Sequence, residues 1–433
     1  MTAPTVTEVG ERDVVVHEVV SQPIPTRRRI ITGSLMIIAG MLAIFGLGIG
    51  AKHGSAVFGL SPADVANPTE LSVPAAGTAV VLGVIVTLIG LFQLVRGFTR
   101  RAMPTITGVV LACLVAAFLC WAASGSEIPM LGLLQNSIFL AVPLILGALG
   151  GVLCERSGVI NVAIEGQMLT GAFAAALFAT VSHNLGVGTV AAVIAGGLIG
   201  AMLAVFAIRY VVNQVILGVV LNVFALGLTG FLYDALLQPN QDQFNSPATF
   251  SAVAIPGLSS IPFIGPLLFD TNVLVYLTYV LIVVVDVWLF RTRWGLRTRA
   301  VGEHPKAADT VGIKVLAIRY RNTIMGGCVA GLAGAYITIG TIGAFSKNIS
   351  SGKGFIALAA LIFGRWSPRG AVAAALLFGF ADALQTELSI ITTPVQIPSA
   401  FLAMLPYLAT IFAVAGLVGR VRAPAADGEP YVK

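Results

Sequence analysis

The residues best suited to chemistry lie at 155–168, ERSGVINVAIEGQM, where polar groups interrupt an otherwise apolar stretch. Ionisable and amide side chains are costly inside a membrane and usually face a cavity or a partner group there. If a helix begins near Gly158, Glu165 lies about 10 Å along it and shares a face with Asn161, because positions i and i+4 are neighbours on a helix. We therefore predict that Asn161, Glu165 and Gln167 offer hydrogen bonds to a polar, uncharged solute.

A structural role for the same segment is the alternative. Glu155 and Arg156 would then form an ion pair at the membrane interface, and Glu165 would bond to the backbone of a neighbouring helix. Two further polar residues, Asn222 and Asp382, fall inside other apolar runs and are weaker candidates for the solute pathway. For these two residues, a hydrogen bond between helices is the commoner use.

A second segment of interest is strongly basic: 291–321, RTRWGLRTRAVGEHPKAADTVGIKVLAIRYR, holds eight basic and two acidic residues. Within it, Pro305 suits the first turn of a helix and Gly312 its C-terminal stop, so we predict a short helix over 304–311. Such a helix has little reason to be ordered alone, and we expect it to fill a groove on another protein. The alternative is an ordinary basic loop. The residues expected to couple the chain to that partner are Gly302, Glu303, Pro305, Ala307, Ala308 and Gly312.

The composition restricts where these segments can lie. Of 433 residues, 57% are hydrophobic and only 10% are charged, against about 25% charged in ordinary soluble domains. Soluble globular, disordered, collagen-like and disulfide-rich secreted proteins are excluded, because none tolerates so much apolar surface. The chain is therefore predicted to be an all-α polytopic membrane protein.

Apolar runs give the candidate membrane spans. A helix needs about 20 apolar residues to cross a bilayer core of about 30 Å, and one run is too short to cross as a straight helix. We therefore expect about 10–12 transmembrane helices with one short or broken helix. The twelve runs are 30–50, 77–95, 104–123, 132–153, 162–182, 187–208, 213–235, 272–290, 322–343, 354–364, 370–387 and 399–419.

The basic residues set the orientation of these helices. With the N-terminus inside, 22 of the 25 Lys and Arg residues fall in cytoplasmic segments, and only Lys52, Lys347 and Lys353 fall outside. Because cytoplasmic loops are enriched in Lys and Arg, both termini are predicted to be cytoplasmic, in a protein of the plasma membrane. Basic loops facing anionic membrane lipid account for the formal net charge of +6, so no nucleic-acid partner is expected.

The sequence lacks the usual signs of catalysis. Its four cysteines and four histidines are scattered, which suggests no metal site, and no phosphate-binding loop of the G-x-x-x-x-G-K-[ST] type occurs. We expect a transport subunit rather than an enzyme, with no cofactor on this chain and with ATP and Mg²⁺ on a separate ATPase. The alternative is a secondary transporter driven by an ion gradient, which would favour paired membrane carboxylates or broken helices in two related halves.

Three motifs occur in order along the chain: the 155–168 segment, GEHPKAADTVGI at 302–313, and the glycine-punctuated GFIALAALIFGRWSPRG at 354–370. Together they resemble the permease subunits of ABC importers of the ribose, branched-chain amino-acid and nucleoside type. The 302–313 motif is similar to the cytoplasmic coupling segment of that family, where the ATPase docks. The 155–168 motif is similar to the signature of the nucleoside-importing branch.

The resemblance implies a function and a set of partners. It implies a permease that passes a nucleoside, or next a simple sugar, while ATPase closure pushes the coupling helix. The partners would be an ABC ATPase, a second and non-identical permease, and an extracytoplasmic solute-binding lipoprotein. The expected parts are a disordered cytoplasmic tail at 1–29, an N-terminal extension of two helices at 30–103, the permease domain at 104–420 and a cytoplasmic tail at 421–433.

Overall fold

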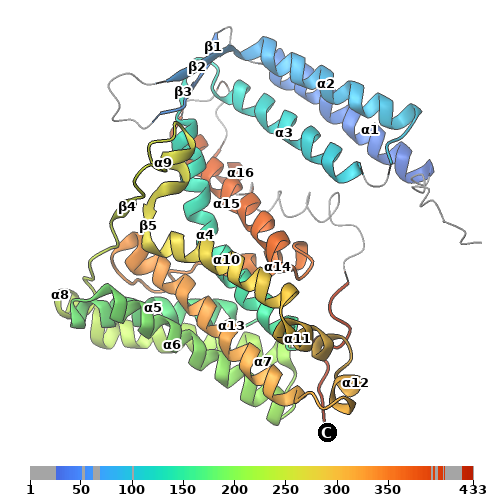
Figure 1. Cartoon of the computed structure of the whole chain (residues 1–433). Helices are drawn as coiled ribbons and strands as arrows, with labels where there is room; N and C mark the ends of the chain where they lie inside the picture. The colour runs from blue at the N-terminus through green and yellow to red at the C-terminus, as the bar shows by residue number, and fades with distance from the viewer. Residues whose placement is uncertain are drawn as a thin grey trace, which may run out of the picture. The chain divides into compact units, whose positions relative to one another are not determined.

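The computed structural model describes residues 26–50, 54–61, 69–99, 102–391, 394, 398–402, 404 and 422–432. Within these residues, ten helices are long and apolar enough to cross a membrane, which confirms the predicted all-α polytopic fold (Figure 1). Four of them continue into a π-helical turn (η). The ten are α1 with η1 (Thr26–Gly48), α2 (Ala75–Val95), α3 (Met103–Ala122), α4 (Met130–Glu155), α5 (Ile164–Ser182), α6 with η2 (Leu185–Arg209), α7 with η3 (Gln214–Leu237), α10 (Val273–Arg291), α13 with η4 (Val315–Ile342) and α15 (Pro368–Ile390).

Short elements connect these helices. The predicted short helix at 354–364 is α14 (Lys353–Phe363), whose 11 residues are too few to cross a bilayer. The last predicted span, 399–419, and the predicted tail at 1–29 lie largely outside the described residues. The other short helices are α8 (Gln241–Phe244), α9 (Ile264–Phe269), α11 (Arg293–Glu303), α12 (Pro305–Thr310) and α16 (Ser399–Leu402).

Five short strands form two small sheets. Strands β1 (Ser55–Gly59), β2 (Glu70–Pro74) and β3 (Glu127–Ile128) pair in the order β2-β1-β3, with β1 and β3 parallel. Strands β4 (Ala252–Ala254) and β5 (Asp270–Asn272) form an antiparallel pair in the segment between α7 and α10.

The described chain divides into two compact units. The first contains described residues up to Ala56 together with Val73–Gly125, and it holds α1, α2 and α3. The second contains Val57–Ser72 and the residues from Ser126 onward. The first unit thus holds α3 together with the two helices of the expected extension, 30–103, and the division into an extension and a permease domain stays a prediction.

The second unit is built around α13, which packs against α4, α5 and α6. In this unit α5 and α6 lie side by side (Figure 1). Small residues allow the backbones to approach closely, as is common between membrane helices. A Cβ atom added to Gly334 of α13 would lie only 2.1 Å from the Met168 carbonyl oxygen of α5, and one added to Gly196 of α6 would lie 2.4 Å from the Gly327 carbonyl oxygen.

Candidate functional site

The 155–168 segment is a break between two helices. Helix α4 ends at Glu155 and α5 begins only at Ile164, so the prediction that a helix begins near Gly158 is wrong. Gly158 has a φ of +87°, in the left-handed region that favours glycine. A Cβ atom there would also lie 2.7 Å from Arg319 Nη2. The backbone conformation and the lack of space therefore both require glycine, and the helix cannot start there.

Glu165 lies in the first turn of α5 and binds the start of α14. Its Oε1 accepts hydrogen bonds from Ser350 Oγ at 2.5 Å and from the Gly352 amide at 2.8 Å, and its Oε2 accepts one from the Gly354 amide at 2.5 Å. The first amides of a helix have no partner within the helix, and the N-terminal end of a helix attracts negative charge. Glu165, only 7% exposed, therefore supplies both the acceptors and the charge that the start of α14 needs.

Asn161 and Gln167 form a reciprocal amide pair. Asn161 Nδ2 donates to Gln167 Oε1 at 3.0 Å, and Gln167 Nε2 donates to Asn161 Oδ1 at 3.2 Å. Both side chains are fully buried. Since Asn161 precedes α5, it does not share a helical face with Glu165, contrary to the predicted i, i+4 relation. The pair instead ties the break to the first turn of α5.

Asn222 connects α7 to the same place. Its Oδ1 accepts from the Gly166 amide at 2.8 Å, and its Nδ2 donates to the Val162 carbonyl at 2.9 Å. Eight residues earlier on α7, or about 12 Å along the helix, Gln214 Oε1 accepts from the Ile160 amide at 2.7 Å. Two side chains of α7 therefore satisfy backbone groups of the break.

Four of the five residues predicted for the solute pathway thus meet at the α4–α5 break. The fifth, Asp382, lies half-buried on α15 and is not part of this cluster. The sequence analysis missed Gln214 and Ser350, which complete the cluster. A signal for Ser350 was present, because the serines and glycines of the SSGKG stretch at 350–354 precede an apolar run too short to cross the membrane.

A second irregular segment lies opposite the break. Between η4 and α14, residues 343–352 include positive φ values at Gly343, Asn348, Ser351 and Gly352. Helices interrupted inside the membrane are the elements from which many transporters build substrate sites, because the interrupted backbone offers hydrogen-bonding groups. The hydrogen bonds of Glu165 join the two interrupted segments to each other. Among the described residues, no group of histidine, cysteine and carboxylate side chains could hold a metal ion.

The end of α4 is bound to the turn between α14 and α15. Glu155 Oε2 accepts from the Trp366 indole, and Arg156 Nε donates to the Trp366 carbonyl at 2.6 Å. Glu155 and Arg156 thus both bond to this turn. The structural alternative predicted an ion pair between these two residues, and no such pair is found in the described chain.

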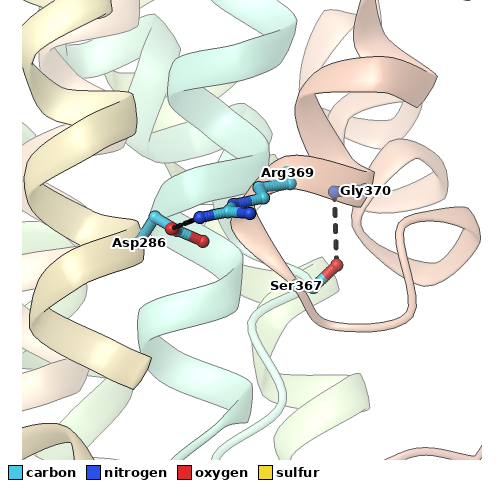
Figure 2. A network of polar contacts seen from close by, with 4 residues as sticks. All are labelled: Asp286, Ser367, Arg369 and Gly370. Atoms are coloured by element: carbon cyan, nitrogen blue, oxygen red, sulfur yellow. Dashed lines mark hydrogen bonds and ion pairs between the residues drawn. The ribbon is translucent and has the colours of Figure 1, made fainter. Parts of the chain in front are cut away.

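The start of α15 is held in two ways, which Figure 2 shows. Ser367 Oγ accepts from the Gly370 amide at 3.2 Å and so caps α15, and Arg369 binds Asp286 of α10 with an Nη2–Oδ2 distance of 2.8 Å. The turn that receives Glu155 and Arg156 is therefore fixed to α10 as well.

The basic segment forms the predicted short helix. Helix α12 begins at Pro305, ends at Thr310 and is followed by Gly312 with a φ of +83°, so the prediction of a helix over 304–311 is confirmed to within one residue at each end. The residues from 315 onward already belong to α13.

The coupling residues predicted in this segment fall on two faces. Ala308 is buried against the start of α13, and a Cβ atom on the buried Gly302 would lie 2.3 Å from the Arg156 carbonyl oxygen. Glu303, Ala307 and Gly312 are exposed and Pro305 is partly exposed. Next to them, Val311 is 74% exposed.

Comparisons with known proteins agree with this architecture. Residues 133–415 match the family described as the permease component of the branched-chain amino acid transport system. A guanosine ABC transporter permease protein of Bacillus subtilis is 42% identical over 303 residues, which cover 68% of this chain and 94% of the relative. A nucleoside ABC transporter permease protein of Lactococcus lactis is 39% identical over 309 residues, covering 70% and 96%.

A more distant relative is a putative glucose ABC transporter permease protein of Haloferax volcanii, 35% identical over 254 residues, covering 59% of this chain and 77% of the relative. No solved structure is a significant match to the chain.

These findings decide between the alternatives left open by the sequence. The family and the apolar helices make the chain a multi-pass protein of the plasma membrane. Its relatives are transport components that associate with an ATPase, so a transport subunit is confirmed and a secondary transporter is not favoured. The chain therefore belongs to the family of branched-chain amino acid transport system permeases and is the membrane permease subunit of an ABC importer.

Proposed function

We propose that this permease imports a nucleoside. The observation that carries the proposal is that the two relatives described as guanosine and nucleoside permeases align over nearly their whole length, 94% and 96%, whereas the glucose relative aligns over 77%. The site is consistent with a neutral, hydrogen-bonding solute, because its amides lie where two helices are interrupted and its single carboxylate, Glu165, is already bound by protein donors. A simple sugar is the second candidate.

Uptake measurements test this proposal. A deletion strain carrying the chain with its ATPase and other subunits is expected to accumulate radiolabelled guanosine, adenosine or uridine, and to do so better than ribose. The same strain without this chain provides the background. Uptake of ribose alone would indicate that the solute is a sugar and not a nucleoside. Uptake of none of the four would contradict the proposal.

The proposal includes a complete importer. The ATPase would hold ATP and Mg²⁺, while this chain would pair with a second, non-identical permease and receive solute from an extracytoplasmic solute-binding lipoprotein. The four polar residues at the α4–α5 break, Asn161, Glu165, Gln167 and Asn222, would border the pathway. In the described conformation they bond to protein groups, so the opening of the pathway would involve a change in these bonds.

Within this assembly, α12 would be the contact for the ATPase. The support is the exposed apolar side chain of Val311, with the small exposed Ala307 on the same short segment. Val311→Asp would place an unpaired charge in that contact, and we expect at least about a tenfold loss of ATPase affinity. Co-purification of the ATPase with the permease is the measurement.

A matched variant controls for the added charge. Val253 lies on β4, in the segment predicted to face the outside, and is 47% exposed. Val253→Asp is expected to leave ATPase co-purification unchanged. Equal retention of the ATPase by Val311→Asp and the unmodified chain would remove Val311 from the contact.

A further inference from the structure

The described C-terminal segment, residues 422–432, lies against the end of α11, directly before α12. The Ala426 amide donates to the Gly302 carbonyl at 2.9 Å, and the Ala425 amide donates to Glu303 Oε2 at 3.2 Å. Figure 1 shows this segment, in red, beside α11 and α12. We call residues 422–432 the C-terminal strap.

Tyr431 of the strap packs directly under α12. Its ring is part of an apolar cluster, and its hydroxyl hydrogen-bonds to the Asp309 carboxylate of α12. Since α12 has only six residues and buries Ala308 alone, a contact of this kind adds much to the order of the helix. The buried members of the cluster are Val301, Ala308, Val315 and Ile318.

The strap is also bound by α13. Arg319 is only 2% exposed, and its Nη1 donates to the Glu429 carbonyl at 2.7 Å while its Nη2 donates to the Ala426 carbonyl at 3.4 Å. A buried guanidinium needs such acceptors, because an unpaired buried charge is strongly destabilising. The strap therefore supplies two carbonyl acceptors to a buried arginine that belongs to a membrane-spanning helix.

A third set of contacts reaches the α4–α5 break. The Asp427 carboxyl hydrogen-bonds to the Glu155 carboxylate at the end of α4. Burial, and next the charge of Glu155, raise the pKa of Asp427. A Cβ atom on Gly158 would lie 2.9 Å from the Ala426 carbonyl oxygen, which shows that the strap directly adjoins the break.

We propose that the C-terminal strap links α12 to the α4–α5 break, so that a displacement of α12 by the ATPase reaches the segment that holds Asn161 and Glu165. The inference rests on the proposed function in that α12 is taken as the ATPase contact. One short segment touches α12, α13 and the break at once, while Ala307 on α12 and Val311 directly after it stay exposed. The strap and the ATPase thus use different faces of α12.

Hydrogen exchange tests the attachment of α12 independently of transport. In the purified complex with the ATPase, Tyr431→Ala is expected to speed amide exchange at 305–313 by at least about fivefold, the effect of losing roughly 1 kcal/mol of local stability. Tyr431→Phe, which removes only the hydroxyl, should give a smaller increase. Val432→Ala is the matched control, because Val432 is the next residue and is 74% exposed.

Coupling is the second measurement on the same variants. The number of radiolabelled guanosine molecules moved per ATP hydrolysed should fall in Tyr431→Ala and in a chain lacking residues 422–433, while the ATPase still co-purifies. Unchanged exchange at 305–313 in both variants would overturn the attachment, and faster exchange with an unchanged ratio would overturn the link to transport. Failure of the proposed function would give a different result. Val311→Asp would then bind the ATPase normally, or the unmodified chain would not transport guanosine. The hydrogen-exchange result at 305–313 does not depend on either outcome.

Discussion

At Glu165, one carboxylate accepts three hydrogen bonds from the segment that starts α14, and each donor comes from residues about 187 positions away in sequence. Hydrogen bonds to a buried charged group contribute about 1.5–3 kcal/mol each. Glu165→Ala is therefore expected to lower stability by about 3 kcal/mol or more and to reduce uptake through loss of the α14 start. Glu165→Gln keeps one acceptor oxygen and should be intermediate. Melting of the detergent-purified complex, measured beside uptake, checks both variants.

Asp382 provides the control for this prediction. It is a half-buried carboxylate of the same predicted pathway, but it lies on α15 apart from the break. Asp382→Asn is expected to leave melting unchanged. If Glu165→Ala instead melted normally but lost uptake, Glu165 would be a solute contact, as its spacing first suggested, rather than a residue that positions α14.

Local signals explain which site residues could be read from the sequence. Pro305 and Gly312 mark the ends of α12 because each acts through its own backbone geometry. The hydrogen-bonded pair of Asn161 and Gln167 could not be predicted in the same way, because it depends on the backbone conformation of the α4–α5 break. The hydrogen-bond partners of Glu165 lie at 350–354, far away in the sequence, so local spacing could not reveal them. Local spacing instead predicted an i, i+4 relation between Asn161 and Glu165, which is absent because α5 begins only at Ile164.

Among the elements, α13 leaves little room for side chains where it packs against neighbouring helices. Gly334 faces the backbone of α5, and a Cβ atom there would lie 2.1 Å from the Met168 carbonyl oxygen. Gly334→Ala must therefore separate the two helices, with an expected loss of about 1–3 kcal/mol. The melting temperature of the detergent-purified permease is the measurement.

A glycine in open space is the matched control for this element. A Cβ atom on Gly227 of α7 would meet nothing within 4 Å. Gly227→Ala should be neutral or stabilise the helix by about 0.5–1 kcal/mol, since alanine is favoured over glycine in helices. A smaller loss for Gly334→Ala than for Gly227→Ala would mean that α5 and α13 can move apart without cost.

The elements themselves were largely predictable because apolar length is a strong signal. Ten predicted spans appear among the described residues, and the one predicted to be short is α14. The start of α5 was placed too early, because Val159, Ile160 and Val162 continue the apolar pattern although Gly158 has already left helical geometry. Hydropathy records burial in the membrane and does not record whether the buried backbone is helical.

At the scale of the whole molecule, the two units differ in their relation to the family. The family match begins at residue 133, after the first unit ends at Gly125. The nucleoside relative of Lactococcus lactis is covered over 96% of its length by 70% of this chain. The helices α1, α2 and α3 therefore lie outside the residues that match the family.

A truncated chain tests this division. We expect an initiator methionine followed by residues 126–433 to insert and to take up solute at a rate comparable to the full chain. Residues 126–129 carry no Lys or Arg and can be translocated, while Arg156, Arg209 and the basic residues of 291–299 remain to orient the helices. The deletion also removes β1 and β2, and with them residues 57–72 of the second unit, but only β1 of these two strands pairs with β3, which has two residues.

Uptake in the deletion strain and co-purification of the ATPase are the two readouts for the truncated chain. ATPase binding reports that the second unit has folded, because α11 and α12 lie within it. Normal ATPase binding with lost uptake would show that α1–α3 take part in transport itself. Loss of both would mean that the second unit does not fold without the deleted residues, which include its own residues 57–72.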